Sequence, residues 1–302
     1  GVDTNVASVE DFIEVGKFLA KNGVTAWLPT FVPDSDENYQ RQIITLEKVI
    51  EMQQDFRIAQ VIGVHYEGVF ANQQMCGALR PQYFKTFTGQ ELSELPTLKN
   101  GVHHTTYAPE IAGGIELTEE LSKQGWIPSI GHTKADFATL EAAFAAGAKH
   151  VTHLFNAMTG IHHREIGVAG WALTKDEIFC EIIADGIHVH PKILKFTTEN
   201  KPSDKLILVS DSVAPTGLGD GDFEIWGEKV SVVNGKTQNE RGSIAGSVIT
   251  MIDAVKMMLS IGVSPVDVSK MASANPAKLL GIDKDFGTIE VGKRADLVVL
   301  DE

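Results

Sequence analysis

The sequence has few cysteines, few basic residues and no long apolar run, and each shortage excludes a class of protein. Only Cys76 and Cys180 occur among 302 residues, so a disulfide framework and a thiolate metal cluster are excluded and a cytoplasmic location is expected. No stretch approaches the roughly 20 apolar residues that span a bilayer, and we expect no secretory leader. Lys and Arg number 26 against 40 Asp and Glu, a formal charge of −14, which argues against nucleic acid and membrane as partners.

The composition and length are those of an ordinary globular protein. Hydrophobic residues make up 43% of the chain and charged residues 22%, which excludes disorder, collagen and coiled coil. The length is about twice that of a typical domain, yet α/β barrels reach this size as one unit. The sequence contains no internal repeat and no low-complexity linker.

Short apolar runs alternate with helical patterns over the first two thirds of the chain. Buried strands separated by helices predict a parallel sheet with right-handed crossovers. The predicted strands are Val24–Pro29, Ala59–Glu67, Val102–Ala108, Trp126–His132, His150–Asn156, Phe179–Asp185 and Leu206–Asp211. The predicted helices are one that starts at a Ser8/Asp11 capping box, then Asp34–Gln53, Ala135–Ala148 and Pro191–Asn200.

Seven such strands are one short of a (β/α)8 barrel. We therefore expect a TIM-like barrel whose first strand lies upstream of Gly1, and an open doubly wound sheet is the alternative. Alternating apolar residues over Phe223–Val233, followed by Asn234-Gly235, predict a β-hairpin. We also expect helices at Ser247–Ile261 and Pro265–Leu280, and two short β runs between Gly287 and Leu300. This divides the chain into a barrel, residues 1–285 with a hairpin insertion at 223–235, and part of an accessory β domain, residues 286–302.

Four ionisable residues close, or nearly close, predicted strands: Glu67, His132, His153 and Asp211. In a barrel, the strand ends share one open mouth. Two imidazoles and a carboxylate suit Zn²⁺ or Fe²⁺ and leave a position for water, whose pKa can then fall to about 7. A further carboxylate could take that proton and pass it to a leaving group. The four positions are far apart in the sequence, so hydrogen-bonded polar residues at the rim of the sheet are the alternative.

Six short motifs follow one another in order through the barrel region. They are Val64-His65-Tyr66-Glu67-Gly68, Gly131-His132-Thr133, Thr152-His153-Leu154-Phe155-Asn156-Ala157-Met158, His162-His163-Arg164-Glu165, Ala184-Asp185-Gly186-Ile187-His188 and Val209-Ser210-Asp211-Ser212. Together they closely resemble the N-acetylglucosamine-6-phosphate deacetylases of the amidohydrolase superfamily. Ala245-Gly246-Ser247 and the segment 287–298 extend the resemblance over nearly the whole chain.

The resemblance implies a metal-dependent hydrolase. Glu67, His132 and His153 would bind one or two divalent ions, zinc or iron, and Asp211 would be the catalytic acid and base. The reaction would release acetate from N-acetylglucosamine 6-phosphate, giving glucosamine 6-phosphate in amino-sugar catabolism. The substrate contacts carried over are Ala78, Leu79, Asn156, Ala157, Arg164, His188, Ile244, Ala245 and Gly246. The resemblance also implies a homodimer in which Arg164 reaches the phosphate bound by the neighbouring chain; a surface ion pair with Glu165 is the alternative for Arg164.

The chain departs from the family pattern at several positions. The family's His-x-His pair would precede Gly1, which leaves the number of metals open. Leu79 stands where relatives usually have His or Gln, so either Arg80 substitutes or that contact is weakened. Val69 and Ile166 replace prolines.

Two other functions remain open on the sequence alone. The first is deacetylation of N-acetylgalactosamine 6-phosphate, which differs from the glucosamine substrate by one epimeric hydroxyl. The second is a catalytically silent barrel that binds a sugar phosphate. Leu79 favours the silent barrel, whereas the intact glutamate, histidines and aspartate speak against it.

Overall fold

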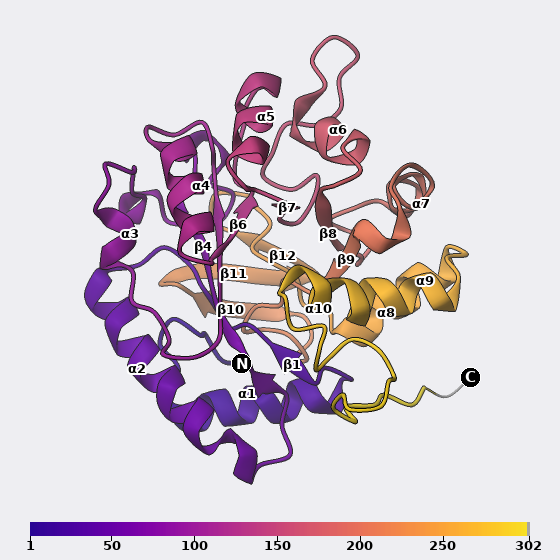
Figure 1. Ribbon diagram of the computed structural model, residues 1–302. Coiled ribbons are helices and arrows are strands. Elements are labelled where there is room, and N and C mark those ends of the chain that lie inside the picture. Colours follow the sequence, from indigo (N-terminus) through magenta and orange to yellow (C-terminus); the bar gives the residue numbers. More distant parts are fainter. Residues whose placement is uncertain (301–302) are drawn as a thin grey trace.

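The computed structural model describes residues 1–300, and one curled parallel sheet organises them (Figure 1). Its seven strands are hydrogen-bonded in the order β2-β4-β5-β6-β7-β8-β9. Because the order follows the chain without a reversal, the sheet winds in one direction, as in a (β/α)8 barrel, and the doubly wound alternative is wrong. The strands are β2 Thr30–Phe31, β4 Gly63–Phe70, β5 Val102–Tyr107, β6 Ile127–Ile130, β7 His150–Val151, β8 Phe179–Ile183 and β9 Leu206–Val209.

The sheet does not close within residues 1–300. The two outermost strands, β2 and β9, each pair on one side only. A short parallel pair, β1 Ala26–Trp27 and β3 Gln60–Val61, precedes β2 and β4 in the chain. The strand predicted over Val24–Pro29 is therefore confirmed only as the short β1, and the edge strand of the main sheet, β2, begins one residue beyond the predicted end.

Helices connect the strands and surround the sheet, as Figure 1 shows for α2 to α7. Ser8 accepts the backbone N–H of Asp11, and the Asp11 carboxylate accepts the N–H of Ser8, which confirms the predicted capping box. Pro191 occupies the first turn of its helix as predicted. The helices are α1 Val9–Lys21, α2 Asp36–Met52, α3 Glu91–Glu94, α4 Gly114–Lys123, α5 Phe137–Ala145, α6 Gly167–Thr174, α7 Pro191–Asn200, α8 Met251–Ser260, α9 Pro265–Ser269 and α10 Asn275–Leu279.

Three helices were not predicted, and one helix is interrupted. α6 is buried on almost every side, so it carries no apolar stripe that would reveal it in the sequence. α4 begins after Gly113, which offers no capping side chain, and α3 has a single turn. The helix predicted over Pro265–Leu280 is present, but a π-helical turn at Lys270–Ala274 separates α9 from α10.

A three-stranded antiparallel sheet, the insertion sheet, leaves the barrel after β9. It consists of β10 Gly221–Ile225, β11 Glu228–Val233 and β12 Lys236–Asn239. The turn predicted at Asn234-Gly235 is confirmed, since both residues have positive φ and Val233 pairs with Lys236. A second turn at Trp226-Gly227 splits the strand predicted over Phe223–Val233. Gly227 suits such a turn, but tryptophan rarely adopts positive φ, so Trp226 did not indicate it.

The β runs predicted between Gly287 and Leu300 are wrong for the described chain, which has no strand there. Ile289, Val291 and Val299 are almost fully exposed. A strand needs a partner to satisfy its backbone groups, and alternating apolar residues alone do not supply one. Residues 301 and 302 lie outside the described residues, and the division of the chain at residue 285 stays a prediction.

Within residues 1–300, no helix combines the length and apolar character needed to cross a lipid bilayer.

Candidate active site

Four side chains from separate strand ends meet in one cavity. Glu67 lies in β4 where the pairing with β5 shifts register, and each of the other three follows its strand by two residues. His132, His153 and Asp211 all have positive φ, at 49°, 30° and 48°. Non-glycine residues rarely adopt this backbone, and it persists where the surrounding structure holds it. The chain thus turns sharply out of β6, β7 and β9, and the four side chains line the same cavity.

Glu67, His132 and His153 converge on a common point. The Oε1 atom of Glu67 lies 3.2 Å from Nε2 of His132 and 3.0 Å from Nε2 of His153, and the two Nε2 atoms are 3.2 Å apart. All three side chains are less than a tenth exposed. This confirms that the predicted carboxylate and imidazoles come together.

The protonation pattern of this cluster fits a cation. Nδ1 of His132 donates to the carbonyl of Met75 at 2.8 Å, so in the neutral ring Nε2 carries a lone pair that faces Glu67 and His153. Burial opposes a charged His153, but the Glu67 carboxylate outweighs it and raises the pKa of His153 to about 9. Nδ1 of His153 is buried and has no hydrogen-bond partner among residues 1–300. A positive charge is therefore favoured between these donors, as a proton or as a divalent ion bound by the three residues.

Asp211 lies beside the cluster at the end of β9. Burial, and next the Glu67 carboxylate, raise the pKa of Asp211 to about 7. A carboxyl group with this pKa exchanges a proton near neutral pH, as a general acid and base must. The backbone carbonyl of Asp211 accepts the N–H of Ser247 at 2.7 Å, which fixes the loop that carries the carboxylate.

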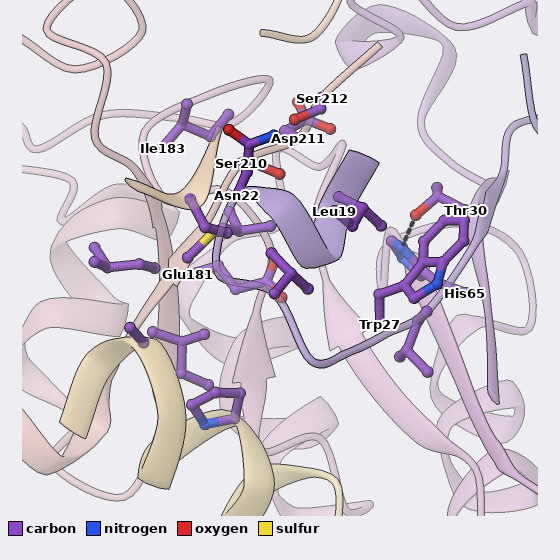
Figure 2. A pocket seen from close by; sticks show the side chains of 18 of the residues that line it. Leu19, Asn22, Trp27, Thr30, His65, Glu181, Ile183, Ser210, Asp211 and Ser212 are labelled. Atoms are coloured by element: carbon purple, nitrogen blue, oxygen red, sulfur yellow. Dashed lines mark hydrogen bonds between the residues drawn. The ribbon is translucent and has the colours of Figure 1, made fainter. Parts of the chain in front are cut away.

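The cavity lies where the sheet is open. Its volume is about 1720 Å³. Figure 2 shows Ser210, Asp211 and Ser212 on one side and Trp27, Thr30 and His65 on the other. Thr30 lies in the edge strand β2, His65 in the neighbouring β4 and Trp27 in β1, whereas Ser210 to Ser212 follow the other edge strand, β9. The cavity therefore extends between the two unpaired edges of the sheet.

Most of the predicted substrate residues line this cavity, and two do not. Ala245 is buried behind it, packed among apolar residues that include Ile225 and Val230. Arg164 is exposed outside it and contacts His163, with no carboxylate partner among residues 1–300, so the ion pair with Glu165 is absent. The residues at the cavity are Ala78, Leu79, Asn156, Ala157, His188, Ile244 and Gly246.

Arg80 does not take over the role of the polar group that Leu79 replaces. Its Nη2 atom donates to the Asp34 carboxylate at 2.9 Å and to the Pro33 carbonyl at 2.7 Å. Arg80 is also absent from the cavity lining, whereas Leu79 belongs to it and is 4% exposed. The expectation that Arg80 substitutes is therefore wrong.

The sequence reasoning missed Glu181 in the middle of β8. Glu181 lines the cavity, and burial raises the pKa of its carboxyl to about 8. A charged residue in an otherwise apolar strand was a signal for it. His104 and His150, which received no functional assignment, are buried inside the barrel and bonded to each other at 3.1 Å.

The chain resembles known proteins over nearly its whole length. Residues 17–302 match the amidohydrolase family. The chain is 35% identical to N-acetylglucosamine-6-phosphate deacetylase of Bacillus subtilis, over 99% of this chain and 76% of that one. It is 33% identical to N-acetylgalactosamine-6-phosphate deacetylase of Escherichia coli O157:H7, over 100% and 80%.

A solved structure agrees with this likeness. The N-acetylglucosamine-6-phosphate deacetylase of Thermotoga maritima superposes with a TM-score of 0.89 and 32% identity, over 97% of this chain and 79% of that one. Its identity and coverage are close to those of the sequence relatives, so fold and sequence point to the same family. The chain belongs to the amidohydrolase family and, within it, to the N-acetylglucosamine-6-phosphate deacetylases.

Proposed function

We propose that this chain hydrolyses the acetamide of N-acetylglucosamine 6-phosphate to glucosamine 6-phosphate and acetate, in amino-sugar catabolism. The observation that carries the proposal is the convergence of Glu67, His132 and His153 to within 3.2 Å of one another, in the same cavity as Asp211. The chain with this arrangement is 35% identical to the N-acetylglucosamine-6-phosphate deacetylase of Bacillus subtilis.

We assign Glu67, His132 and His153 as the ligands of a divalent metal, zinc or iron. Imidazole nitrogen and carboxylate oxygen suit both ions. The Met75 carbonyl fixes the ring of His132 with Nε2 toward the cluster, which is how ligating histidines are usually oriented. A bound ion supplies a water activated at neutral pH and stabilises negative charge on the amide oxygen.

We assign Asp211 as the acid and base. Its carboxylate would take the proton of the attacking water and return it to the amide nitrogen, which cannot leave as an unprotonated amide ion. The raised pKa of Asp211, about 7, supports both halves of this transfer at neutral pH.

We assign the sugar and acetyl contacts to Ala78, Leu79, Ile244 and Gly246, and the phosphate to His188 and the backbone amides near Asn156 and Ala157. We also propose a cytoplasmic homodimer in which Arg164 contributes to the phosphate site of its neighbour. Arg164 is exposed outside the cavity of its own chain and has no carboxylate partner among residues 1–300, which supports this role. The two free cysteines fit a reducing compartment.

The epimer, N-acetylgalactosamine 6-phosphate, is the second candidate substrate, because a relative acting under that name is 33% identical over the whole chain. The test is acetate release from the metal-loaded chain with each sugar phosphate and with unphosphorylated N-acetylglucosamine. We expect the highest kcat/KM for N-acetylglucosamine 6-phosphate. A higher value for the epimer would reassign the substrate, and no acetate from any of the three would favour the silent barrel. Elemental analysis of the same samples gives the ion and its number per chain.

A further inference from the structure

The loop between β8 and α7 holds a carboxylate and an imidazole in one rigid unit. Oδ1 of Asp185 accepts the backbone N–H groups of Ile187 at 2.8 Å and His188 at 2.7 Å. Oδ2 of Asp185 lies 2.6 Å from Nδ1 of His188. The side chains of Asp185 and His188 are only 2% and 7% exposed. Asp185 therefore binds both the backbone that positions His188 and the ring itself.

This unit fixes which nitrogen of His188 is presented to the cavity. Burial opposes ionisation of Asp185, but its bonds to His188 and to the backbone outweigh burial and hold the pKa of Asp185 below its usual value. A carboxylate only accepts, so Nδ1 of His188 must carry a proton. Nε2 has no hydrogen-bond partner among residues 1–300, and the ring lines the cavity beside Asp211.

We propose that Asp185 is a positioning residue that holds His188 as a phosphate-binding side chain, an inference that rests on the proposed function. With Nδ1 bonded to the Asp185 carboxylate, Nε2 is the ring nitrogen that meets the phosphate, and a proton held between Nε2 and a phosphate oxygen completes a charge-assisted hydrogen bond. Nε2–H then donates to a phosphate oxygen of the substrate. Because the loop already holds the ring in place, little rotamer entropy is lost when the phosphate binds.

Substitution by asparagine separates this role from a structural one. In Asp185→Asn, the amide oxygen still accepts both backbone N–H groups, whereas the amide NH₂ donates to Nδ1 and removes the charge. For the sugar phosphate we expect KM to rise by about tenfold with kcat within about threefold, because a contact made equally in ground and transition state affects KM. His188→Gln should have the same effect, and the double variant should be no worse than His188→Gln.

Two controls make the kinetic test specific. Asp220 also accepts two backbone N–H groups, from Asn234 and Gly235, without a histidine, so Asp220→Asn should leave KM and kcat unchanged. Unphosphorylated N-acetylglucosamine should be turned over equally by the wild type, Asp185→Asn and His188→Gln. An equal loss with and without the phosphate, or additive effects in the double variant, would overturn the proposal.

A spectroscopic measurement tests the Asp185–His188 unit independently of activity. It remains decisive for this inference even if the chain releases no acetate and the proposed function fails. Long-range ¹H–¹⁵N spectra of ¹⁵N-histidine protein report which ring nitrogen is protonated, and His188→Gln assigns the signal. In the wild type we expect the proton of His188 on Nδ1, and in Asp185→Asn we expect it on Nε2. Addition of inorganic phosphate should change the ¹⁵N chemical shift of Nε2 in the wild type alone. A wild-type His188 without a proton on Nδ1, or the same phosphate response in both proteins, would refute the inference.

Discussion

Replacement of Asp211 by asparagine tests the chemical core of the site. The change removes the proton-accepting carboxylate and keeps the shape of the side chain. Asparagine tolerates the positive φ of this position better than most residues. The backbone carbonyl that accepts the N–H of Ser247 is unaffected, so we expect the loop after β9 to keep its conformation.

The expected loss is large because Asp211 would act twice in each turnover. General acid–base catalysis contributes about 10²- to 10⁴-fold, which corresponds to about 3–5 kcal/mol of activation free energy. Asp211 takes part in both proton transfers, so we expect the upper part of that range. Metal content should not change, because the group of converging donor atoms consists of Glu67, His132 and His153 without Asp211.

The assay is acetate release at saturating substrate, measured beside the metal content of the same preparation. Asp222→Asn is a matched control, since Asp222 is exposed on the insertion sheet and should tolerate the change without loss of rate. A fall in kcat of less than about tenfold in metal-loaded Asp211→Asn would refute the assignment. Loss of metal in this variant would instead make Asp211 a ligand.

Three further predictions concern the cluster, the core and an exposed carboxylate. Glu67→Gln should weaken metal binding by more than about 100-fold, measured by competition with a chelator, because even groups that only orient ligands contribute 10- to 100-fold. Leu140→Ala, at a fully buried position of α5, should lower the free energy of unfolding by about 2–5 kcal/mol in urea titrations, and a smaller loss would mean that the core repacks. Hydrogen bonds to Ser264, Ser203 and Lys270 lower the pKa of Asp267 to about 2. The ionised Asp267 carboxylate therefore stabilises the folded chain at pH values above 3.8, its pKa in the unfolded chain, and this stabilisation is lost as the pH falls through about 2. The unfolding midpoints of wild type and Asp267→Asn should thus converge as the pH is lowered. A difference that stays constant with pH would contradict this prediction.

The parts of the fold that sequence could predict are those with local signals. The Ser8/Asp11 capping box, the proline that opens α7 and the Asn234-Gly235 turn each depend on neighbouring residues. α6 could not be recognised because it is buried on nearly all sides. The turn at Trp226 places tryptophan at positive φ, a backbone conformation that a bulky side chain disfavours.

The site shows the same limit. Glu67, His132, His153 and Asp211 were predicted because each closes an apolar run, but their convergence depends on sheet order and on sharp turns after three strands. Arg80 has the right chemistry near Leu79 and is nevertheless engaged by Asp34. Which of two partners a guanidinium binds is decided by distances that a sequence does not contain.

The left-handed backbone at His132, His153 and Asp211 has a consequence for the evolution of this protein. Each such residue costs on the order of 1 kcal/mol relative to glycine. Replacement of one of these residues by glycine would therefore relieve backbone strain and remove a functional side chain in the same mutation, so a loss of activity could be accompanied by a gain in backbone stability. At these three positions the side chain that the proposed chemistry requires differs from the residue that the backbone conformation favours.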